Sequence, residues 1–182
     1  RLTPDMVVVL GDRYEIFAAV CAAYVSRIPI SHIHGGETTA GAYDEGFRHA
    51  ITKMSYLHFA STEDYRDRII RMGEDPERVW NVGSLGVEIC RKTEFLTLAE
   101  LMDVLGLVFD NNLAVVVFHP VTLEDNTSEQ CFKEVLKALE GFPELRLLFI
   151  KANSDGGGRA INALINVYVA ANGDKAVAFD SL

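Results

Sequence analysis

Residues 7–58 decide the fold, and they read VVVLGDRYEIFAAVCAAYVSRIPISHIHGGETTAGAYDEGFRHAITKMSYLH. Two short apolar runs, Met6–Leu10 and Ile28–Ile33, each stop abruptly at polar and glycine residues. Short apolar runs bounded in this way favour strands of a parallel sheet that is buried on both faces. Open α/β sheets bind ligands at the carboxyl ends of their strands. The stretch therefore predicts a ligand site where GDR and HGGE follow the two strands.

The same alternation of strands and helices continues to the end of the chain. The predicted strands are Met6–Leu10, Ile30–Ile33, Leu57–Ala60, Val79–Val82, Leu113–Phe118, Leu145–Ile150 and Ala176–Phe179. The predicted helices are Tyr14–Val25, Glu45–Ser55 with Asp44 as N-cap, a helix from Ser61–Asp64 to near Gly73, Thr97–Leu105, Ser128–Leu139 and Ala160–Ala171. This βαβ order predicts parallel strands with right-handed crossovers. We expect two Rossmann-like α/β domains, 1–88 and 89–182, with the second range including the linker.

The amino-acid composition indicates which kinds of binding partner and which cellular compartment to expect for the protein. The formal net charge is −9 and lysine and arginine do not cluster, which argues against nucleic acid or an anionic membrane as the main partner. No apolar run approaches the roughly 20 residues needed to span a bilayer. The three cysteines, Cys21, Cys90 and Cys131, are scattered among apolar residues, so we expect reduced, buried thiols and a cytoplasmic protein.

Two carboxylates and a histidine follow the first two strands. Asp12 sits in a tight Gly-Asp-Arg turn, where it is either a turn residue paired with Arg13 or a carboxylate available to move a proton. His34 and Glu37 flank Gly35 and Gly36, and glycine permits close approach of backbone to a ligand. An ordinary flexible loop with a solvated Glu37 is the alternative reading.

A second polar cluster opens the helix that follows this loop. Asp44 and Glu45 precede Arg48 and His49 by one turn. The cluster is either an N-cap with an i, i+4 pair, worth a few tenths of a kcal/mol, or a helix N-terminus that faces an anion.

The second half of the chain offers weaker signals. His119 ends a very apolar strand, where it either points into a cleft or bonds to backbone. The segment Asn153–Arg159, which includes Asp155, is a glycine-rich turn between a strand and a helix. It has the location of a phosphate-binding turn but lacks the Walker lysine and the GxGxxG spacing. The spacing of histidines and cysteines predicts no metal site.

Together these pieces resemble the UDP-N-acetylglucosamine 2-epimerase family, and most closely its hydrolysing branch, which serves sialic-acid biosynthesis. The matching segments are PDMVVVLGDRYEIFAA, IPISHIHGGETTAGAYDEGFRHAITKMSYLHFASTEDY, GEDPERVWNVGSLGVE, FHPVT and NSDGGGR. They cover most of the chain in the family's order. LGDR followed by HIHGGE and RHAITK is specific, whereas the last two segments alone are weak.

The resemblance implies two Rossmann-like domains that face each other across a cleft, as in GT-B glycosyltransferases. It implies conversion of UDP-N-acetylglucosamine and water into N-acetylmannosamine and UDP, with no cofactor and with a homo-oligomer, a dimer or tetramer, as the working form. It also implies that both domains are incomplete here, because a first strand would precede Arg1 and a Ser-rich UDP-binding turn would follow Leu182. A GT-B-type glycosyltransferase and a catalytically inert sugar-nucleotide-binding fragment are the alternatives.

Catalytic roles carry over by matching motif. Asp12 of LGDR and Asp44 before RHAITK match family acids, and His119 of FHPVT matches a family histidine. A third family acid falls at His34, because some relatives have EGGE where this chain has HGGE, so either His34 or Glu37 takes that role. The predicted substrate-binding residues are Arg13, Gly35, Gly36, Glu45, Arg48, His49, Asn153 and Asp155.

Overall fold

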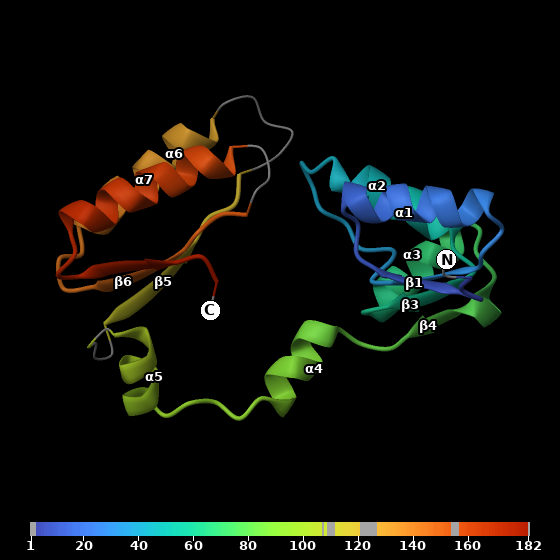
Figure 1. Cartoon of the computed structure of the whole chain (residues 1–182), viewed down its shortest axis with the longest axis horizontal. Helices are drawn as coiled ribbons and strands as arrows, with labels where there is room; N and C mark the ends of the chain where they lie inside the picture. The colour runs from blue at the N-terminus through green and yellow to red at the C-terminus, as the bar shows by residue number, and fades with distance from the viewer. Residues whose placement is uncertain (1–2, 107, 109–111, 121–126, 154–156, 182) are drawn as a thin grey trace. The chain divides into compact units, whose positions relative to one another are not determined.

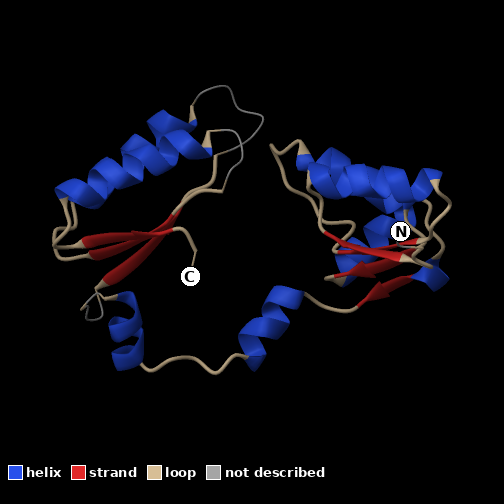
Figure 2. Ribbon diagram, viewed as in Figure 1, coloured by secondary structure: helices blue, strands red, loops and turns tan. Residues whose placement is uncertain are grey.

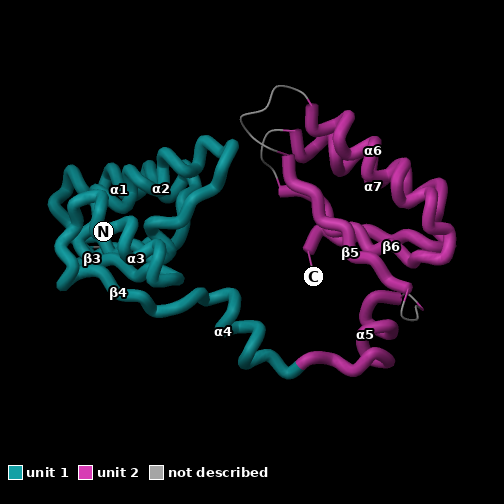
Figure 3. Tube along the Cα trace, turned by 180° about the vertical axis from the view of Figure 1, so that it is seen from behind, with its two compact units in different colours: residues 1–94 teal, residues 95–182 magenta. Residues whose placement is uncertain are grey.

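The computed structural model describes residues 3–106, 108, 112–120, 127–153 and 157–181. The chain forms two compact units, residues 1–94 and residues 95–182 (Figure 3). Each unit has its own parallel sheet and its own apolar core. The predicted α/β architecture with parallel strands is confirmed. The boundary predicted after residue 88 lies inside a helix, α4 (Leu85–Lys92), and the division between the units follows that helix.

Unit 1 contains four parallel strands in the order β1-β2-β3-β4. The strands are β1 (Val7–Leu10), β2 (Ile30–Ile33), β3 (Leu57–Ala60) and β4 (Val79–Asn81). The intervening helices are α1 (Tyr14–Val25), α2 (Asp44–Met54), α3 (Glu63–Arg71) and a 3₁₀ turn, Pro76–Arg78 (Figure 1). Strands added in sequence order through right-handed crossovers place all their helices on one face of the sheet. The buried side chains agree, because Val9, Ile30, Ala60 and Val79 share that face and pack beneath α1, α2 and α3.

The opposite face of the first sheet is exposed at the outer strands, β1 and β4, in the described residues. Val8 and Leu10 of β1 are exposed, Val8 by 63%, and so is Trp80 of β4. Burial on both faces, predicted from the apolar runs, is therefore wrong for β1. It holds for β2, where Ile30, Ser31 and His32 are all buried.

Unit 2 repeats the pattern with three parallel strands in the order β5-β6-β7. The strands are β5 (Leu113–Val117), β6 (Arg146–Ile150) and β7 (Ala176–Phe179). Helices α6 (Ser128–Glu140) and α7 (Gly158–Ala171) cover one face, and α5 (Leu98–Leu105) packs on the other (Figure 2). None of the helices in these described stretches is both long and apolar enough to cross a membrane.

Three local expectations are wrong. Asp44 is the first helical residue of α2 instead of its N-cap, because the cap position falls at Tyr43. The cysteines are free but not buried, since Cys90 and Cys131 are exposed and Cys21 is half-buried. His58, whose place as the second residue of a short predicted strand suggests the sheet edge, is buried in β3, where its Nε2 lies 3.3 Å from Glu74 Oε2.

Candidate functional site

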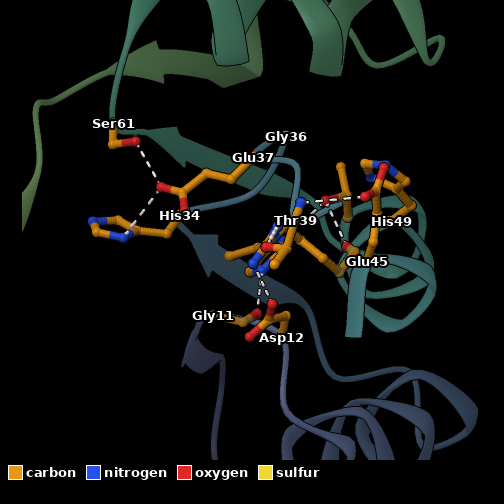
Figure 4. Close-up of polar contacts among 12 residues, drawn as sticks. Gly11, Asp12, His34, Gly36, Glu37, Thr39, Glu45, His49 and Ser61 are labelled. Atoms are coloured by element: carbon orange, nitrogen blue, oxygen red, sulfur yellow. Dashed lines mark hydrogen bonds and ion pairs between the residues drawn. The ribbon is translucent and has the colours of Figure 1, made fainter. Parts of the chain in front are cut away.

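The carboxyl ends of the unit 1 strands bring the predicted catalytic residues to one edge of the sheet (Figure 4). The backbone ladder continues past the strand ends: Gly11 N donates to Ile33 O at 3.0 Å, and His34 N donates to Phe59 O at 2.8 Å. These bonds fix the backbone that carries Asp12 beside the backbone that carries His34. Ser61, which follows β3, lies at the same edge.

Asp12 is held by an arginine from α2. The Arg48 guanidinium forms an ion pair with the Asp12 carboxylate, and the Arg48 side chain is 8% exposed while that of Asp12 is 21% exposed. Arg48 Nη1 also donates to Thr39 Oγ1 at 3.2 Å, and Thr39 N donates to Glu45 Oε2 at 3.2 Å. One buried cation therefore ties the β1 turn to the loop between β2 and α2. A charge-assisted contact of this kind orients a carboxylate while leaving its second oxygen free to act.

His34 belongs to a second polar group. Its φ of 64° is left-handed, which is rare outside glycine and occurs more often for histidine than for most residues. His34 Nδ1 lies 3.4 Å from Glu37 Oε1, and Ser61 Oγ donates to the same oxygen at 2.7 Å (Figure 4). Leu85 N, at the start of α4, donates to His34 Nε2 at 3.5 Å. An accepting Nε2 leaves the ring hydrogen of the neutral imidazole on Nδ1, facing the Glu37 carboxylate.

The glycine pair packs against protein. A methyl group at Gly35 would lie 2.9 Å from His32 Nδ1 and 3.0 Å from Thr52 Oγ1. One at Gly36, whose φ is +77°, would lie 2.5 Å from the carbonyl oxygen of Tyr65 in α3. Close packing of the loop against α2 and α3 is therefore sufficient to require glycine at both positions, without any ligand contact.

The other predicted residues of unit 1 lie around this edge. His49 Nε2 lies 3.5 Å from Glu45 Oε1, one helical turn away (Figure 4). Asp44 is half-buried in the first turn of α2. Arg13 pairs with Glu15, because its Nε donates to the exposed Glu15 carboxylate at 3.2 Å. The alternative of an Asp12–Arg13 turn pair is therefore replaced by a pair of Asp12 with Arg48.

The unit 2 candidates lie at the carboxyl edge of the second sheet. His119 is exposed, two residues after β5. Asn153 is exposed, three residues after β6, and Gly157 ahead of α7 has a φ of 84°. Asp155 lies outside the described residues. No cluster of three histidine, cysteine, aspartate or glutamate side chains with metal-binding geometry occurs within the described part of the chain.

Four side chains that shape this edge were not predicted from the sequence. They are His32, Thr39, Thr52 and Ser61. Thr39 and Ser61 were hidden because their partners, Arg48 and Glu37, are distant in sequence. One signal was available for Ser61, since it follows a strand of the same sheet as the predicted site. His32 is in β2, in register with Val9, and its side chain lies on the face that the helices cover.

Comparison of the chain with known proteins identifies its family. The model of the UDP-N-acetylglucosamine 2-epimerase family matches residues 1–182. A GDP/UDP-N,N'-diacetylbacillosamine 2-epimerase (hydrolyzing) of Campylobacter jejuni is 41% identical over 181 residues, which cover 100% of this chain and 47% of that protein. The polysialic acid biosynthesis protein P7 of Escherichia coli is 43% identical over 91% of this chain and 42% of its own length.

A solved structure gives the same fold. The UDP-GlcNAc 2-epimerase from Neisseria meningitidis, bound to UDP-GlcNAc, matches with a TM-score of 0.72 at 20% identity, over 98% of this chain and 50% of that one. The chain thus spans about half the length of the curated relatives and solved structures that it matches. With a family match along all of its residues, the chain belongs to the UDP-N-acetylglucosamine 2-epimerase family.

Proposed function

We propose that this chain is the part of a hydrolysing UDP-2-acetamido-sugar 2-epimerase that carries most of its catalytic groups. The observation that carries the proposal is the pairing of a partly exposed Asp12 with a His34–Glu37–Ser61 group at one sheet edge. Relatives named as hydrolyzing 2-epimerases support the reaction class. The solved relative bound to UDP-GlcNAc supports a UDP-sugar substrate.

The reaction, written for UDP-GlcNAc, has two balanced steps. A base removes the hydrogen at C2 while the C1–O bond to UDP breaks, which gives UDP and a 2-acetamidoglucal. Water then adds across the double bond, with hydroxyl at C1 and a proton at C2 from the opposite face, which gives N-acetylmannosamine. The chemistry needs a base near C2, an acid or charge stabiliser, and donors for the leaving diphosphate.

The residues can meet these needs as follows. Asp12 acts as the base, because Arg48 fixes its orientation through one carboxylate oxygen and none of the described residues contacts the other. His34 takes the place of a family carboxylate: as the imidazolium, with Nδ1–H held by Glu37, it donates the proton on Nε2, and Nε2 then no longer accepts from Leu85 N. Asp44 supplies the further carboxylate that the family uses. His119 of unit 2 takes its proposed catalytic role from the family motif alone.

The remaining candidates serve binding. His49 is a candidate for a contact with the diphosphate, whereas Asp44 and Glu45 make the first turn of α2 acidic and so unfavourable for an anion. Arg48, buried and engaged with Asp12 and Thr39, supports a positioning role over a diphosphate contact.

Product analysis with the whole protein tests this function. We expect UDP-GlcNAc or UDP-N,N'-diacetylbacillosamine to yield UDP and a free 2-epimerised sugar in equal amounts. A UDP-linked epimer would indicate the non-hydrolysing reaction, and transfer of the sugar to an added acceptor would indicate a glycosyltransferase. Binding of UDP-sugar without turnover of either substrate would leave only a binding protein and would refute the proposal.

A further inference from the structure

A buried histidine, His32, connects three elements directly beneath the site. Its side chain is in β2, it is 0% exposed, and its Nε2 lies 2.8 Å from the carbonyl oxygen of Gly11 at the end of β1. Its Nδ1 lies 3.2 Å from Thr52 Oγ1 in α2. Gly35 closes over the ring, because a methyl group there would touch Nδ1. None of the catalytic roles proposed above uses this side chain.

The hydrogen-bond partners fix which tautomer the ring adopts. A carbonyl oxygen only accepts, so Nε2 must carry a hydrogen toward Gly11. In the neutral ring Nδ1 carries no hydrogen, and it lies 3.2 Å from Thr52 Oγ1, which donates its own hydrogen to Arg48 O at 2.9 Å. Burial lowers the pKa of His32 to about 4, with smaller lowering effects from His58, Arg48 and His34 and a raising effect from the Gly11 bond. The ring is therefore neutral at physiological pH.

We propose that His32 is a positioning residue that sets the place of Asp12. The peptide that His32 holds by its carbonyl is the Gly11–Asp12 peptide, so the bond acts one residue from the proposed base. Through Thr52 the same ring contacts α2 exactly one turn after Arg48, the counter-ion of Asp12. His32 thus fixes both partners of the Asp12–Arg48 pair from below without touching substrate.

The role rests on the proposed function, because Asp12 must be the base for its placement to matter in catalysis. A misplacement of a catalytic group by about 1 Å can cost on the order of 100-fold in rate. Loss of the Gly11 bond should therefore lower kcat and leave KM nearly unchanged, because no substrate contact is removed.

Three variants separate positioning from plain stability. His32→Leu removes both ring nitrogens at similar volume, and His32→Gln returns an amide N–H that can reach Gly11 O. The control is His58→Leu, because His58 is equally buried at 1% and is the register partner of His32 in β3, yet it bonds to Glu74 away from Asp12.

In the whole protein we expect His32→Leu to lower kcat by roughly 10- to 100-fold per folded molecule, and His32→Gln to recover most of it. His58→Leu should lose stability but keep its kcat. If His32→Leu and His32→Gln lose kcat equally, or if His58→Leu loses as much, the positioning role is wrong. If His32→Leu does not fold, His32→Gln is compared with Thr52→Val instead. A kcat near wild type for His32→Gln and a several-fold lower kcat for Thr52→Val support the role. The reverse order overturns it.

A spectroscopic measurement tests the geometry independently of turnover. Long-range ¹H–¹⁵N correlation spectra of histidine-labelled protein should show His32 as the neutral Nε2–H tautomer at pH 7. The Asp12 amide resonance should move in His32→Leu and return toward its wild-type position in His32→Gln. A charged ring or the Nδ1–H tautomer at pH 7 would overturn the proposal even if catalysis were as expected. If no UDP-sugar is turned over, the proposed function fails while these spectra still decide the role of His32.

Discussion

Asp12 carries the largest share of the proposed chemistry, and its surroundings make a precise prediction possible. Its counter-ion Arg48 is almost fully buried, so a neutral residue at position 12 leaves a guanidinium without its charge partner. Removing one member of a buried pair usually destabilises a protein by several kcal/mol. Asparagine still accepts a hydrogen bond, which reduces that cost.

Asp12→Asn should lower turnover by about two to four powers of ten, the usual weight of acid–base catalysis, with a stability loss of about 1–3 kcal/mol. Turnover and urea unfolding are to be measured on the same preparation. Glu129→Gln is the control, because it makes the same chemical change in an exposed ion pair on α6. A variant that loses stability but keeps its turnover per folded molecule would return Asp12 to a structural turn residue.

In the HGGE motif the side chains of His34 and Glu37 are in contact, and we assign them different roles. If His34 is the acid and Glu37 orients it, His34→Gln should abolish most of the rate. Glu37→Gln should cost about tenfold or less, because the amide still accepts from Nδ1–H and from Ser61. Steady-state kinetics of the two variants is the measurement. A mild His34→Gln beside an inactive Glu37→Gln would reverse the two roles.

Two buried histidines make stability depend on pH in a defined direction. Desolvation lowers the pKa of His32 to about 4 and also lowers that of His58, against the opposing effect of Glu74. Below about pH 6.5 these histidines therefore bind protons in the unfolded chain but not in the folded state. The free energy of unfolding consequently falls as the pH drops from 6.5 toward 4. For His32 alone, 2.5 pKa units correspond to about 3 kcal/mol.

Urea unfolding followed by the single tryptophan, Trp80 in β4, reports on unit 1 at pH 7.5, 5.5 and 4.5. We expect the midpoint to fall steadily, and to fall less in His32→Gln. A midpoint that is flat between pH 7.5 and 4.5 would contradict the burial of these neutral rings.

At the scale of elements, the loop between β2 and α2 is fastened from both sides. Arg48 holds Thr39, and Arg68 Nη1 in α3 donates to Gly36 O at 2.7 Å. Gly35→Ala should push this loop away from His32 and Thr52, so that activity falls with a stability loss of about 1–3 kcal/mol. The control is Gly46→Ala on the exposed side of α2, where a methyl group meets nothing within 4 Å. There alanine should stabilise the helix by up to about 1 kcal/mol, as thermal unfolding of both variants would show. Equal effects at the two positions would contradict the packing described for the loop.

Local pattern was enough to predict most elements. The bounds of β2, β3 and α1 agree with the prediction to the residue, because each is a short apolar run or an alanine-rich segment closed by glycine, proline or polar residues. Helix α4 was missed because it is a short segment that contains a glycine, and its apolar side chains Leu85, Val87 and Ile89 are exposed instead of packed in a core. The pairing of Asp12 with Arg48 spans 36 residues and depends on sheet register, which no local pattern contains.

At the scale of the whole molecule, the chain folds into two units, and in each unit polar residues follow the carboxyl ends of the strands. Unit 1 holds the Asp12, His34 and Glu37 groups, and unit 2 holds His119 and Asn153. Family membership covers both units, while the chain spans about half the length of the relatives it matches.

Turnover of UDP-GlcNAc in heavy water tests the central claim most directly. If a base removes the C2 hydrogen and water later returns a proton to that carbon, the released N-acetylmannosamine must carry one deuterium at C2. Mass spectrometry and proton NMR of the free sugar give the position and the extent of labelling. We expect essentially complete incorporation at C2, with UDP released in equal amount. Release of a sugar that keeps its original C2 hydrogen would contradict the elimination mechanism and, with it, the role proposed for Asp12.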